Sequence, residues 1–271
     1  MASVSYIDDT QAGLPPSDRG FAYGDGLFET MLVREGRVRF LKFHLDRLES
    51  GCQRLHIPAP DRDDLAREIQ ARAPGRGESV MKLVLSRGDG PRGYAPPESP
   101  DLRVLFSVAA LQARPAALPP VDTIVLRARL SENEHLAGIK HLCRLEQVIA
   151  AIELDSRSFE QGILLSYSGQ VIGCANANLF LVVGESIVTP QLHTAGIEGV
   201  MRRAVIEACA GVGRNVEKRN VSIEELFAAD GLFLTNALVG IREISSVDGH
   251  AYDAGRTVAD IRRIVDSFSI A

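Results

Sequence analysis

The chain has 271 residues, 45% of them hydrophobic and 24% charged, and its net charge at pH 7 is −5. This composition is typical of a globular protein of one large or two modest domains, and the negative net charge gives no reason to expect the concentrated basic face of a nucleic-acid-binding protein. No stretch reaches the roughly 18 apolar residues of a membrane span, the N-terminus is too acidic for a signal peptide, and the four cysteines are too far apart for a zinc site or a disulfide framework. We therefore expect a cytoplasmic protein with no metal, no membrane and no nucleic-acid partner.

The first half of the chain predicts both strands and helices. Residues 18–30 place three glycines among aromatic side chains, which indicates a tight turn near a ligand or a domain seam, with a plain hairpin loop as the alternative. A helix over residues 44–55 carries Arg47 in its first turn, where free N–H groups favour an anion, although a lone arginine is more often a solvated side chain. The other elements expected here are a strand at 6–7, a hairpin of 31–33 with 38–41, a helix over 61–73, and strands over 80–86 and 102–111.

Two segments rich in proline or glycine follow. Residues 87–97 form a long loop of a kind that tends to be functional or mobile, and its arginines suit an anionic substrate as well as they suit simple solubility. Residues 112–120 contain three prolines and predict a linker. The chain is therefore expected to divide into an N-terminal α+β domain over 1–111 and a C-terminal α+β domain over 121–271.

The C-terminal half opens with a strand over 123–130 and a helix that begins near residue 142. The apolar side chains of this helix recur at helical spacing and are expected to form one inward face. They are Leu142, Leu145, Val148, Ile149 and Ile152. Lys140 stands just before the helix, where the dipole and partial burial both disfavour the protonated amine. A neutral lysine is a nucleophile suited to forming a Schiff base with an aldehyde or ketone, and an ordinary surface lysine is the alternative.

A second motif lies in residues 194–202, where Gly196 and Gly199 precede a helix that runs to about residue 210. Glycines at a helix start leave backbone N–H groups bare, which is the usual arrangement for holding a phosphate, and a plain helix cap is the alternative. Ser222 and Glu225 predict a capping box before a short helix. The remaining elements expected are strands over 162–167, 179–183, 186–189 and 231–235 and a last helix over 257–268.

A nucleophilic lysine, a phosphate turn and a helix-borne arginine together describe a site for pyridoxal 5'-phosphate, whose aldehyde bonds the lysine and whose ring withdraws electrons. With these motifs the chain resembles the fold type IV family of pyridoxal-phosphate enzymes over residues 18–237. Three stretches carry the resemblance: GIKHLCRLEQV at 138–148, SRGDGPRGY at 86–94 and AGIEGVMR at 195–202. The first two look most like the 4-amino-4-deoxychorismate lyases of that family, and the third is shared more widely.

The resemblance implies roles for individual residues. Lys140 would be the Schiff-base lysine, Arg47 the phosphate arginine, and Arg92 and Tyr94 substrate-binding residues. The rest of the phosphate cup would come from Gly199, Val200, Met201, Asn236 and Ala237. The implied fold is α+β, like that of D-amino acid aminotransferase, with two domains and the cofactor in the interdomain cleft. Family members are usually homodimers, with residues 24–30 near the seam.

Two positions depart from the family pattern. The family normally has a glutamate, paired with the pyridine nitrogen, five residues before the asparagine of its Asn-Leu-Phe strand. Here Asn178 is in place, but the fifth residue before it is Gly173. Without that carboxylate the ring nitrogen is expected to be protonated less often, unless Asn176 or Glu160 compensates. The second departure is Cys143, where the lyases usually have asparagine.

The function that the resemblance implies is that of aminodeoxychorismate lyase, a carbon–oxygen lyase that converts 4-amino-4-deoxychorismate to 4-aminobenzoate and pyruvate for folate biosynthesis. A D-amino acid or branched-chain aminotransferase is the alternative enzyme. A non-catalytic protein that only binds pyridoxal phosphate is the alternative from another class, and Gly173 alone supports it. The retention of Lys140, Arg47 and the phosphate turn argues against that last alternative.

Overall fold

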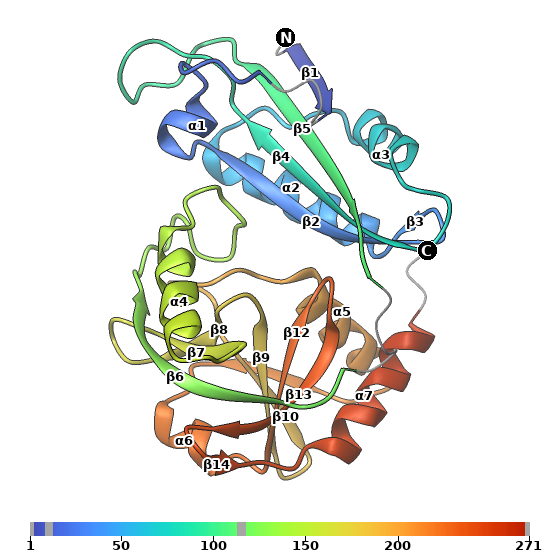
Figure 1. The fold of residues 1–271 in the computed structure, drawn as a ribbon, viewed down its shortest axis with the longest axis vertical. Helices are drawn as coiled ribbons and strands as arrows, with labels where there is room; N and C mark the ends of the chain where they lie inside the picture. Colours follow the sequence, from blue (N-terminus) through green and yellow to red (C-terminus); the bar gives the residue numbers. More distant parts are fainter. Residues whose placement is uncertain (1–2, 9–12, 113–117, 269–271) are drawn as a thin grey trace. The chain divides into compact units, whose positions relative to one another are not determined.

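The computed structural model describes residues 3–8, 13–112 and 118–268, and the chain divides into two compact units (Figure 1). Unit 1 contains the described residues up to 112 together with 139–143, and unit 2 contains 118–138 and 144–268. Part of the expected linker, residues 113–117, lies outside the described residues. Lys140, which its place in the sequence assigns to the second half, thus packs with unit 1.

Unit 1 is built on a five-stranded sheet in the order β1-β5-β4-β2-β3, in which only β1 and β5 pair in parallel. Along β2 the side chains of Leu27, Glu29, Met31 and Val33 alternate into the interior, as the two-residue period of a strand requires. Helix α2 packs against β2. The elements of unit 1 are β1 (Ser3–Asp8), α1 (Arg19–Tyr23), β2 (Gly26–Arg34), β3 (Arg37–Val38), α2 (Leu41–Leu55), α3 (Arg62–Ala71), β4 (Glu78–Ser86) and β5 (Asp101–Ala110).

Two expectations for unit 1 are wrong in detail. Helix α2 begins at Leu41, directly after Phe40 in a left-handed conformation (φ 57°), so Arg47 lies in the second turn and not among the free N–H groups of the first. Residues 18–30 are not a plain turn, because they contain α1. Asp18 caps this helix by accepting a hydrogen bond from the Phe21 N–H (3.1 Å), and Gly24 ends it with φ 69°.

Unit 2 is built on a nine-stranded sheet in the order β11-β10-β9-β12-β13-β6-β7-β8, with β14 paired to β13. The sheet curls, because one buried apolar cluster gathers side chains from β7 and β8 at one end and from β9, β12 and β13 further along the sheet. The strands are β6 (Val121–Leu130), β7 (Gln161–Ser166), β8 (Val171–Cys174), β9 (Asn178–Val183), β10 (Ser186–Pro190), β11 (Val216–Arg219), β12 (Gly231–Asn236), β13 (Gly240–Val247) and β14 (His250–Ala251).

The helices of unit 2 are α4 (Leu145–Ser156), α5 (Val200–Gly211), α6 (Ile223–Ala228) and α7 (Gly255–Ser267). The expected capping box is confirmed: the Glu225 N–H donates to Ser222 Oγ (3.2 Å), and the Ser222 N–H donates to the Glu225 carboxylate (3.0 Å). Within the described ranges, every helix is too short or too polar to span a lipid bilayer.

The expected inward face of the lysine helix is wrong. On α4 the large apolar side chains are exposed, and Ala150 and Leu154 are buried against the strands of unit 2 instead. The exposed fractions are 76% for Leu145, 50% for Val148, 56% for Ile149 and 64% for Ile152. The helix-dipole argument for Lys140 fails as well, because α4 begins five residues after it and the dipole acts within the first turn.

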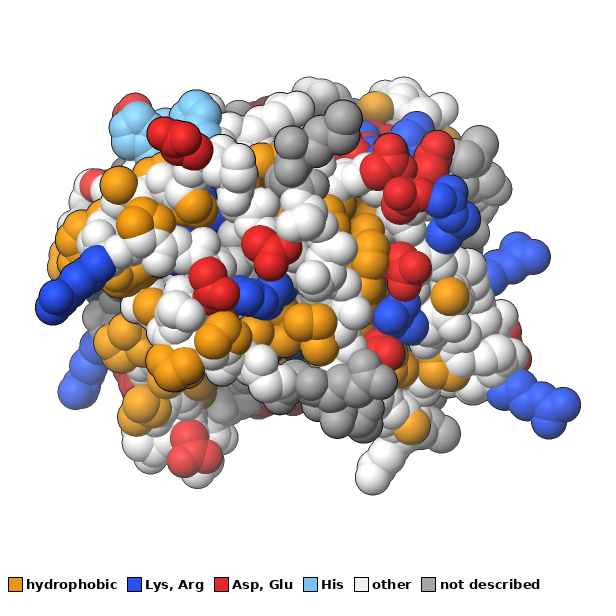
Figure 2. All heavy atoms as spheres, turned by 90° about the horizontal axis from the view of Figure 1, so that it is seen from above, with side chains coloured by type: hydrophobic (Ala, Val, Ile, Leu, Met, Phe, Trp, Pro, Cys, Tyr) orange, Lys and Arg blue, Asp and Glu red, His pale blue; other side chains and the backbone are white. Residues whose placement is uncertain are grey.

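Charged side chains are mixed on the surface. On the face shown in Figure 2, acidic and basic groups lie next to one another rather than in separate fields. Partly exposed ion pairs occur in unit 1, where Arg62 pairs with Asp46 (2.7 Å) and with Glu49 (2.6 Å). The described residues contain no group of three or more His, Cys, Asp or Glu side chains arranged to hold a metal ion.

Candidate active site

The backbone of the lysine segment extends the edge of β2 in unit 1. The Phe28 N–H donates to the Lys140 carbonyl (2.9 Å), and the Leu142 N–H donates to the Gly26 carbonyl (3.1 Å). The side chain of Lys140 is half-buried, and its Nζ lies 4.0 Å from the centre of the Phe28 ring, in a cation–π contact. Two backbone hydrogen bonds and this ring contact therefore fix the lysine against strand β2, outside any helix.

A buried cluster of charged and polar groups lies in the same unit. Arg47 donates to Glu29 through Nε (2.8 Å to Oε1) and through Nη2 (to Oε2). His44 Nδ1 lies 2.6 Å from Glu29 Oε2. Glu29 is 2% exposed and His44 1% exposed, so both groups are removed from water. The three side chains join the inward face of β2 to one face of α2, where residues three apart are neighbours.

The electrostatics of the cluster fix its protonation. Burial opposes ionisation of Glu29, but the charge of Arg47 and the hydrogen bonds from Arg47 and His44 outweigh it and lower the pKa of Glu29 to about 2. Burial lowers the pKa of His44 from its usual value, more than the Glu29 carboxylate raises it, and the charges of Arg47 and Lys140 act in the same direction as burial. Glu29 is therefore an ionised acceptor at neutral pH, and the neutral His44 ring donates its Nδ1–H. The charges of Arg47 and Lys140 both act on His44. The structure therefore places these two predicted residues near the same histidine.

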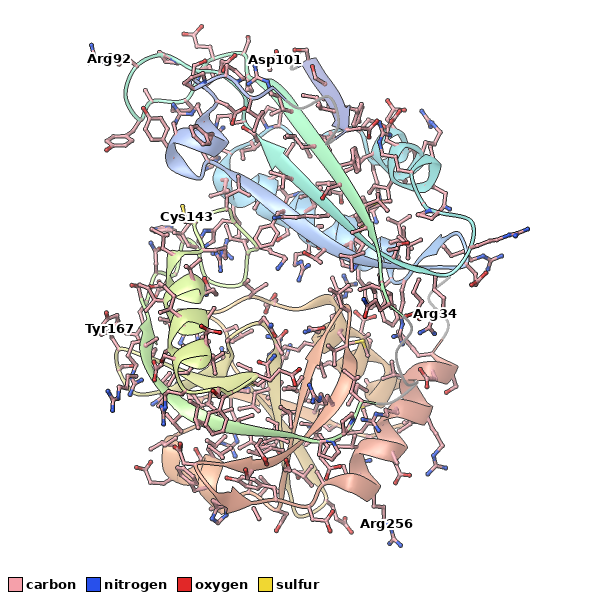
Figure 3. All side chains as sticks on the ribbon, in the orientation of Figure 1. Arg34, Arg92, Asp101, Cys143, Tyr167 and Arg256 are labelled. Atoms are coloured by element: carbon pink, nitrogen blue, oxygen red, sulfur yellow. The ribbon has the colours of Figure 1, made fainter. Side chains whose placement is uncertain are left out.

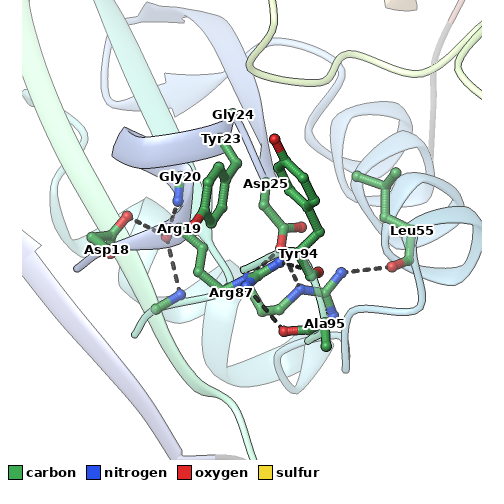
Figure 4. A network of polar contacts seen from close by, with 12 residues as sticks. Asp18, Arg19, Gly20, Tyr23, Gly24, Asp25, Leu55, Arg87, Tyr94 and Ala95 are labelled. Carbon is green, nitrogen blue, oxygen red and sulfur yellow. Dashed lines mark hydrogen bonds and ion pairs between the residues drawn. The ribbon is translucent and has the colours of Figure 1, made fainter. Parts of the chain in front are cut away.

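The loop over residues 87–97 is tied down by a buried network (Figure 4). Arg19 Nε and Arg87 Nε both donate to Asp25 Oδ2, each at 2.8 Å. The same Arg19 guanidinium donates to the three successive carbonyl oxygens of residues 93–95, at 2.8 to 3.2 Å. Burial raises the pKa of Asp25, and the two arginines overcome this and lower it. Arg87 is thus a structural residue, neither a solubilising side chain nor one that faces a substrate.

The two predicted substrate residues sit on the outside of this loop. Arg92 is exposed and points away from the loop (Figure 3). Tyr94 is 83% exposed, and its ring lies 5.3 Å from that of Tyr23. The carbonyl of Tyr94, rather than its ring, is the group that the network holds, so a substrate role for either side chain stays a prediction.

In unit 2 the predicted phosphate turn is a bare helix start. Gly199 is the N-cap of α5, with extended backbone angles (φ −68°, ψ 141°) and no side chain to cap the helix. The Arg203 N–H donates to the Gly199 carbonyl (2.9 Å), so the N–H groups of Val200 and Met201 lie ahead of the helical hydrogen bonds. The side chains of Val200 and Met201 are buried, which leaves their backbone N–H groups as the part that can bind an anion.

Two neighbours brace that turn. Asn178 Nδ2 donates to the Ile197 carbonyl (2.8 Å), and a Cβ on Gly199 would overlap Asn178 Oδ1. Gly138 exchanges two hydrogen bonds with the turn, one to the Gly196 carbonyl and one from the Glu198 N–H, each at 2.9 Å. The turn is therefore held in one shape before any ligand binds.

The second predicted turn lies next to the first. Strand β12 pairs with β9 so that Thr235 stands opposite Asn178. Asn236 Oδ1 accepts hydrogen bonds from the N–H groups of Leu238 (3.0 Å) and Val239 (2.7 Å). Asn236 therefore shapes its own turn, which leaves the backbone of Ala237 to meet an anion. The Thr235 hydroxyl is buried and has no hydrogen-bond partner among the described residues, so it is a further polar group at this place.

The residues fit the aldehyde and phosphate ends of pyridoxal phosphate, but not its ring nitrogen. Gly173 stands opposite Leu164 in the β8–β7 pair and supplies no carboxylate. The two side chains that could replace this carboxylate, Glu160 and Asn176, bind other residues. Glu160 forms an ion pair with Arg242, and Asn176 Oδ1 accepts a hydrogen bond from Gln161 Nε2 (2.7 Å).

Comparison with known proteins gives the family. The amino-transferase class IV model matches residues 26–247. Aminodeoxychorismate lyase of Vibrio harveyi is 34% identical over 239 residues, which cover 88% of each chain. The crystal structure of 4-amino-4-deoxychorismate lyase from Pseudomonas aeruginosa is 40% identical, with a TM-score of 0.87 over 96% of this chain and 97% of its own. Branched-chain aminotransferase from Thermoproteus uzoniensis shares the fold, with a TM-score of 0.84 at 21% identity over 95% of this chain and 90% of its own.

The chain therefore belongs to the class IV aminotransferase family. The expected α+β fold of type IV is confirmed, and so is the resemblance to the lyases within the family.

Sequence reasoning missed several residues of the site. Glu29 and His44 were not singled out, although a glutamate on the inward side of an apolar strand and a histidine three residues before Arg47 were visible signals. Asn178 was noted only as a landmark for its strand, and Gly138 only as part of a motif. No local pattern reveals that these two brace the phosphate turn, because their partners are 19 and about 60 residues away.

Proposed function

We propose that this protein is a pyridoxal-phosphate-dependent aminodeoxychorismate lyase, which converts 4-amino-4-deoxychorismate to 4-aminobenzoate and pyruvate. One observation carries the proposal: two lyases of this kind match the chain at 34% and 40% identity over nearly the whole length of both partners. The geometry agrees, because the lysine segment, the arginine cluster and the bare helix start are all present and rigidly held.

The resemblance to the family assigns the cofactor contacts residue by residue. Lys140 would bond its aldehyde, Arg47 and the N–H groups of Val200, Met201 and Ala237 would hold its phosphate, and the bound ring would supply an electron sink. Gly199 leaves the phosphate turn open. A single residue separates Lys140 from Gly138, which is bonded to that turn, and this short chain connection supports the assignment of both features to one cofactor.

Lys140 then has a second task. Its Nζ, once free as the neutral amine, would take the proton from the substrate ring carbon that carries the amino group. The electron pair of the broken C–H bond would complete the aromatic ring of 4-aminobenzoate as the neighbouring ring carbon–oxygen bond breaks. The ether oxygen would leave with the three-carbon unit as enolpyruvate, which becomes pyruvate by taking up a proton at its methylene carbon from the Lys140 ammonium or from solvent. The pairing of its backbone with β2 keeps Lys140 in place for both tasks.

The absence of a carboxylate at Gly173 suits this reaction better than it suits transamination. A less protonated ring stabilises negative charge on the substrate carbon less well. Aromatisation of the substrate supplies driving force of its own, so a lyase depends less on that stabilisation.

We also propose that the protein is a homodimer, like other members of the family. The exposed apolar stripe of Leu145, Val148, Ile149 and Ile152 on α4 supports this, because large aliphatic side chains that gather on one helix face usually mark an interaction surface. A cytoplasmic location is likewise a proposal. It rests on the four cysteines, which are free thiols in the structure.

The first experiment is a product assay on purified protein with enzymatically generated aminodeoxychorismate. We expect 4-aminobenzoate and pyruvate in equal amounts, and a visible cofactor band that disappears in Lys140→Ala. Arg92→Ala should raise KM if Arg92 binds the dicarboxylate substrate, and an unchanged KM removes that residue from the proposal.

The aminotransferase remains the second candidate function because the branched-chain enzyme shares the fold. A bound cofactor that cycles between its aldehyde and amine forms with an amino acid and a keto acid, without release of 4-aminobenzoate, would favour it. Protein that binds no cofactor would contradict both enzymes.

A further inference from the structure

The cluster of Glu29, His44 and Arg47 has a geometry that stability alone does not explain. Glu29 points inward from β2 between Leu27 and Met31, and the residue is 2% exposed. Placing a charge at a core position is costly even when it is paired, and an apolar side chain of similar size is often as stable there. The buried charge is therefore better explained by the group that Glu29 binds than by stability.

What Glu29 holds is one edge of the Arg47 guanidinium. It accepts from Nε and from Nη2, which uses two of the five N–H donors and fixes the plane of the group. An arginine without such a partner loses side-chain entropy each time it orders around an anion. With Glu29 in place, the orientation of Arg47 is set before the anion arrives.

His44 fixes Glu29 from the other side. Its Nδ1–H donates to Oε2, the oxygen that also accepts from Arg47 Nη2. Because burial keeps the ring neutral, His44 adds a hydrogen bond without adding a second cation that would compete with Arg47 for the carboxylate. The carboxylate thus has one position, and so has the guanidinium bonded to it.

We propose that Glu29 is a positioning residue for cofactor binding, and that it acts by presenting Arg47 to the phosphate in a fixed orientation. The inference rests on the proposed function, in which Arg47 is the phosphate arginine. The inference also predicts a change in phosphate affinity that is opposite in sign to the change predicted from charge alone. Removing the negative charge of Glu29 should strengthen phosphate binding if only Coulomb attraction matters, and should weaken it if orientation matters.

The test compares two probes on the apoprotein by calorimetric titration: pyridoxal 5'-phosphate, and pyridoxal, which lacks the phosphate. We expect Glu29→Gln to weaken binding of the phosphorylated probe by roughly 10-fold to 100-fold, the equivalent of a lost charge-assisted hydrogen bond, and to leave pyridoxal binding unchanged. Arg47→Ala should do the same, and the double variant should be no weaker than Arg47→Ala alone.

Glu29→Asp serves if Glu29→Gln does not fold, because it keeps the buried charge and withdraws it from Arg47 by one methylene. Glu29→Asp too should lower the affinity for pyridoxal 5'-phosphate relative to the affinity for pyridoxal. Glu49→Gln is the matched control. Glu49 lies on α2, as Arg47 does, and pairs with Arg62 at a half-exposed position. Its substitution should leave the ratio of the affinities for pyridoxal 5'-phosphate and pyridoxal as in the wild type.

Three outcomes would overturn the inference. Tighter phosphate binding in Glu29→Gln would show that charge outweighs orientation, and equal weakening of both probes would show a merely structural role. Additive losses in the double variant would show that Glu29 does not act through Arg47. If Arg47→Ala itself leaves the ratio unchanged, the phosphate role of Arg47 in the proposed function fails, and that result is distinct from the other three.

Discussion

Asn178 fills the space that a side chain on Gly199 would need. Its Oδ1 lies where the Cβ of residue 199 would stand, while its Nδ2 donates to the Ile197 carbonyl (2.8 Å). The helix start is therefore open to an anion only because residue 199 has no side chain and Asn178 supports the turn behind it. The backbone angles of Gly199 suit any residue, so the requirement for glycine is one of space.

Gly199→Ala should therefore displace Asn178 and break its bond to Ile197. We expect a loss of about 1–2 kcal/mol in the free energy of unfolding of the apoprotein and weaker retention of pyridoxal phosphate. Gly211→Ala, at the other end of α5, is the control because nothing lies within 4 Å of its added Cβ. It should leave cofactor binding unchanged and raise stability by up to about 1 kcal/mol. Equal effects of the two substitutions on cofactor retention, measured by dialysis, would contradict this account.

The buried Glu29 predicts a dependence of stability on pH. Its pKa is lowered from 4.5 to about 2, so the unfolded chain binds a proton at higher pH than the folded protein does. The stabilisation is complete above pH 4.5 and is lost as the pH falls towards 2, and it amounts to about 3 kcal/mol. His44 acts in the same direction, because its lowered pKa makes the unfolded chain take up a proton first as the pH falls below 6.5.

Urea unfolding measured between pH 7 and pH 2 checks this. The free energy of unfolding of the wild type should fall steeply below pH 4.5, and that of Glu29→Gln should fall less steeply over the same range. Parallel curves for the two proteins would mean that Glu29 has an ordinary pKa in the folded state.

Asp25 predicts a large loss of stability on neutralisation. It is the shared acceptor of Arg19 and Arg87, which are 4% and 6% exposed, so Asp25→Asn leaves two buried cations without their counter-ion. We expect a loss of about 3 kcal/mol in the free energy of unfolding, and faster proteolysis of the loop over residues 87–97 that Arg19 anchors. The control is Asp260→Asn, which breaks an exposed pair with Arg263 and should cost less than about 1 kcal/mol. Similar losses in the two variants would mean that the Asp25 network is not a buried anchor.

Much of the fold was predictable because local patterns report local structure. The helices over 61–73 and 200–210 and the strands over 80–86, 102–111 and 179–183 are found within a few residues of their expected ends. Strand β13 was missed because its sequence GIREISSV interleaves polar and apolar residues without a clear period. Its polar side chains are held by distant groups, as when Arg242 Nε donates to the Pro119 carbonyl (2.7 Å).

The site was predictable only where a motif identified it. Periodicity identified α4 as a helix but assigned the wrong face to the interior, because an apolar stripe reads the same whether it faces a core or another molecule. The space beside β6 and β7 is filled by Ala150 and Leu154 instead. Likewise, nothing local indicates that Lys140 pairs with β2, more than 100 residues earlier in the chain.

The exposed stripe on α4 predicts the oligomeric state. Ile149→Asp and Ile152→Asp should each leave the fold of the protomer intact, since both side chains are more than half exposed, and should weaken dimer formation by about tenfold or more. Ala151→Asp adds the same charge to an exposed position off the stripe and is the matched control. Sedimentation velocity over a concentration series measures the association. A wild type that is monomeric, or a control that dissociates as readily as the stripe variants, would rule out α4 as the dimer surface.

Gly173 gives the sharpest test of how the site is adapted to its reaction. A Cβ at residue 173 would lie 3.1 Å from the Ala177 carbonyl oxygen, so its neighbour would have to give by a few tenths of an ångström, and we expect Gly173→Glu to fold. We expect it to change the pH dependence of the cofactor absorption band, because a carboxylate favours the protonated ring nitrogen, while lyase turnover changes by less than about tenfold. Gly173→Ala, which adds the Cβ without the carboxylate, separates the effect of space from that of charge. A rise in turnover by orders of magnitude in the glutamate variant alone would mean that the wild-type site lacks a group it needs, and the argument that aromatisation makes the carboxylate dispensable would fail.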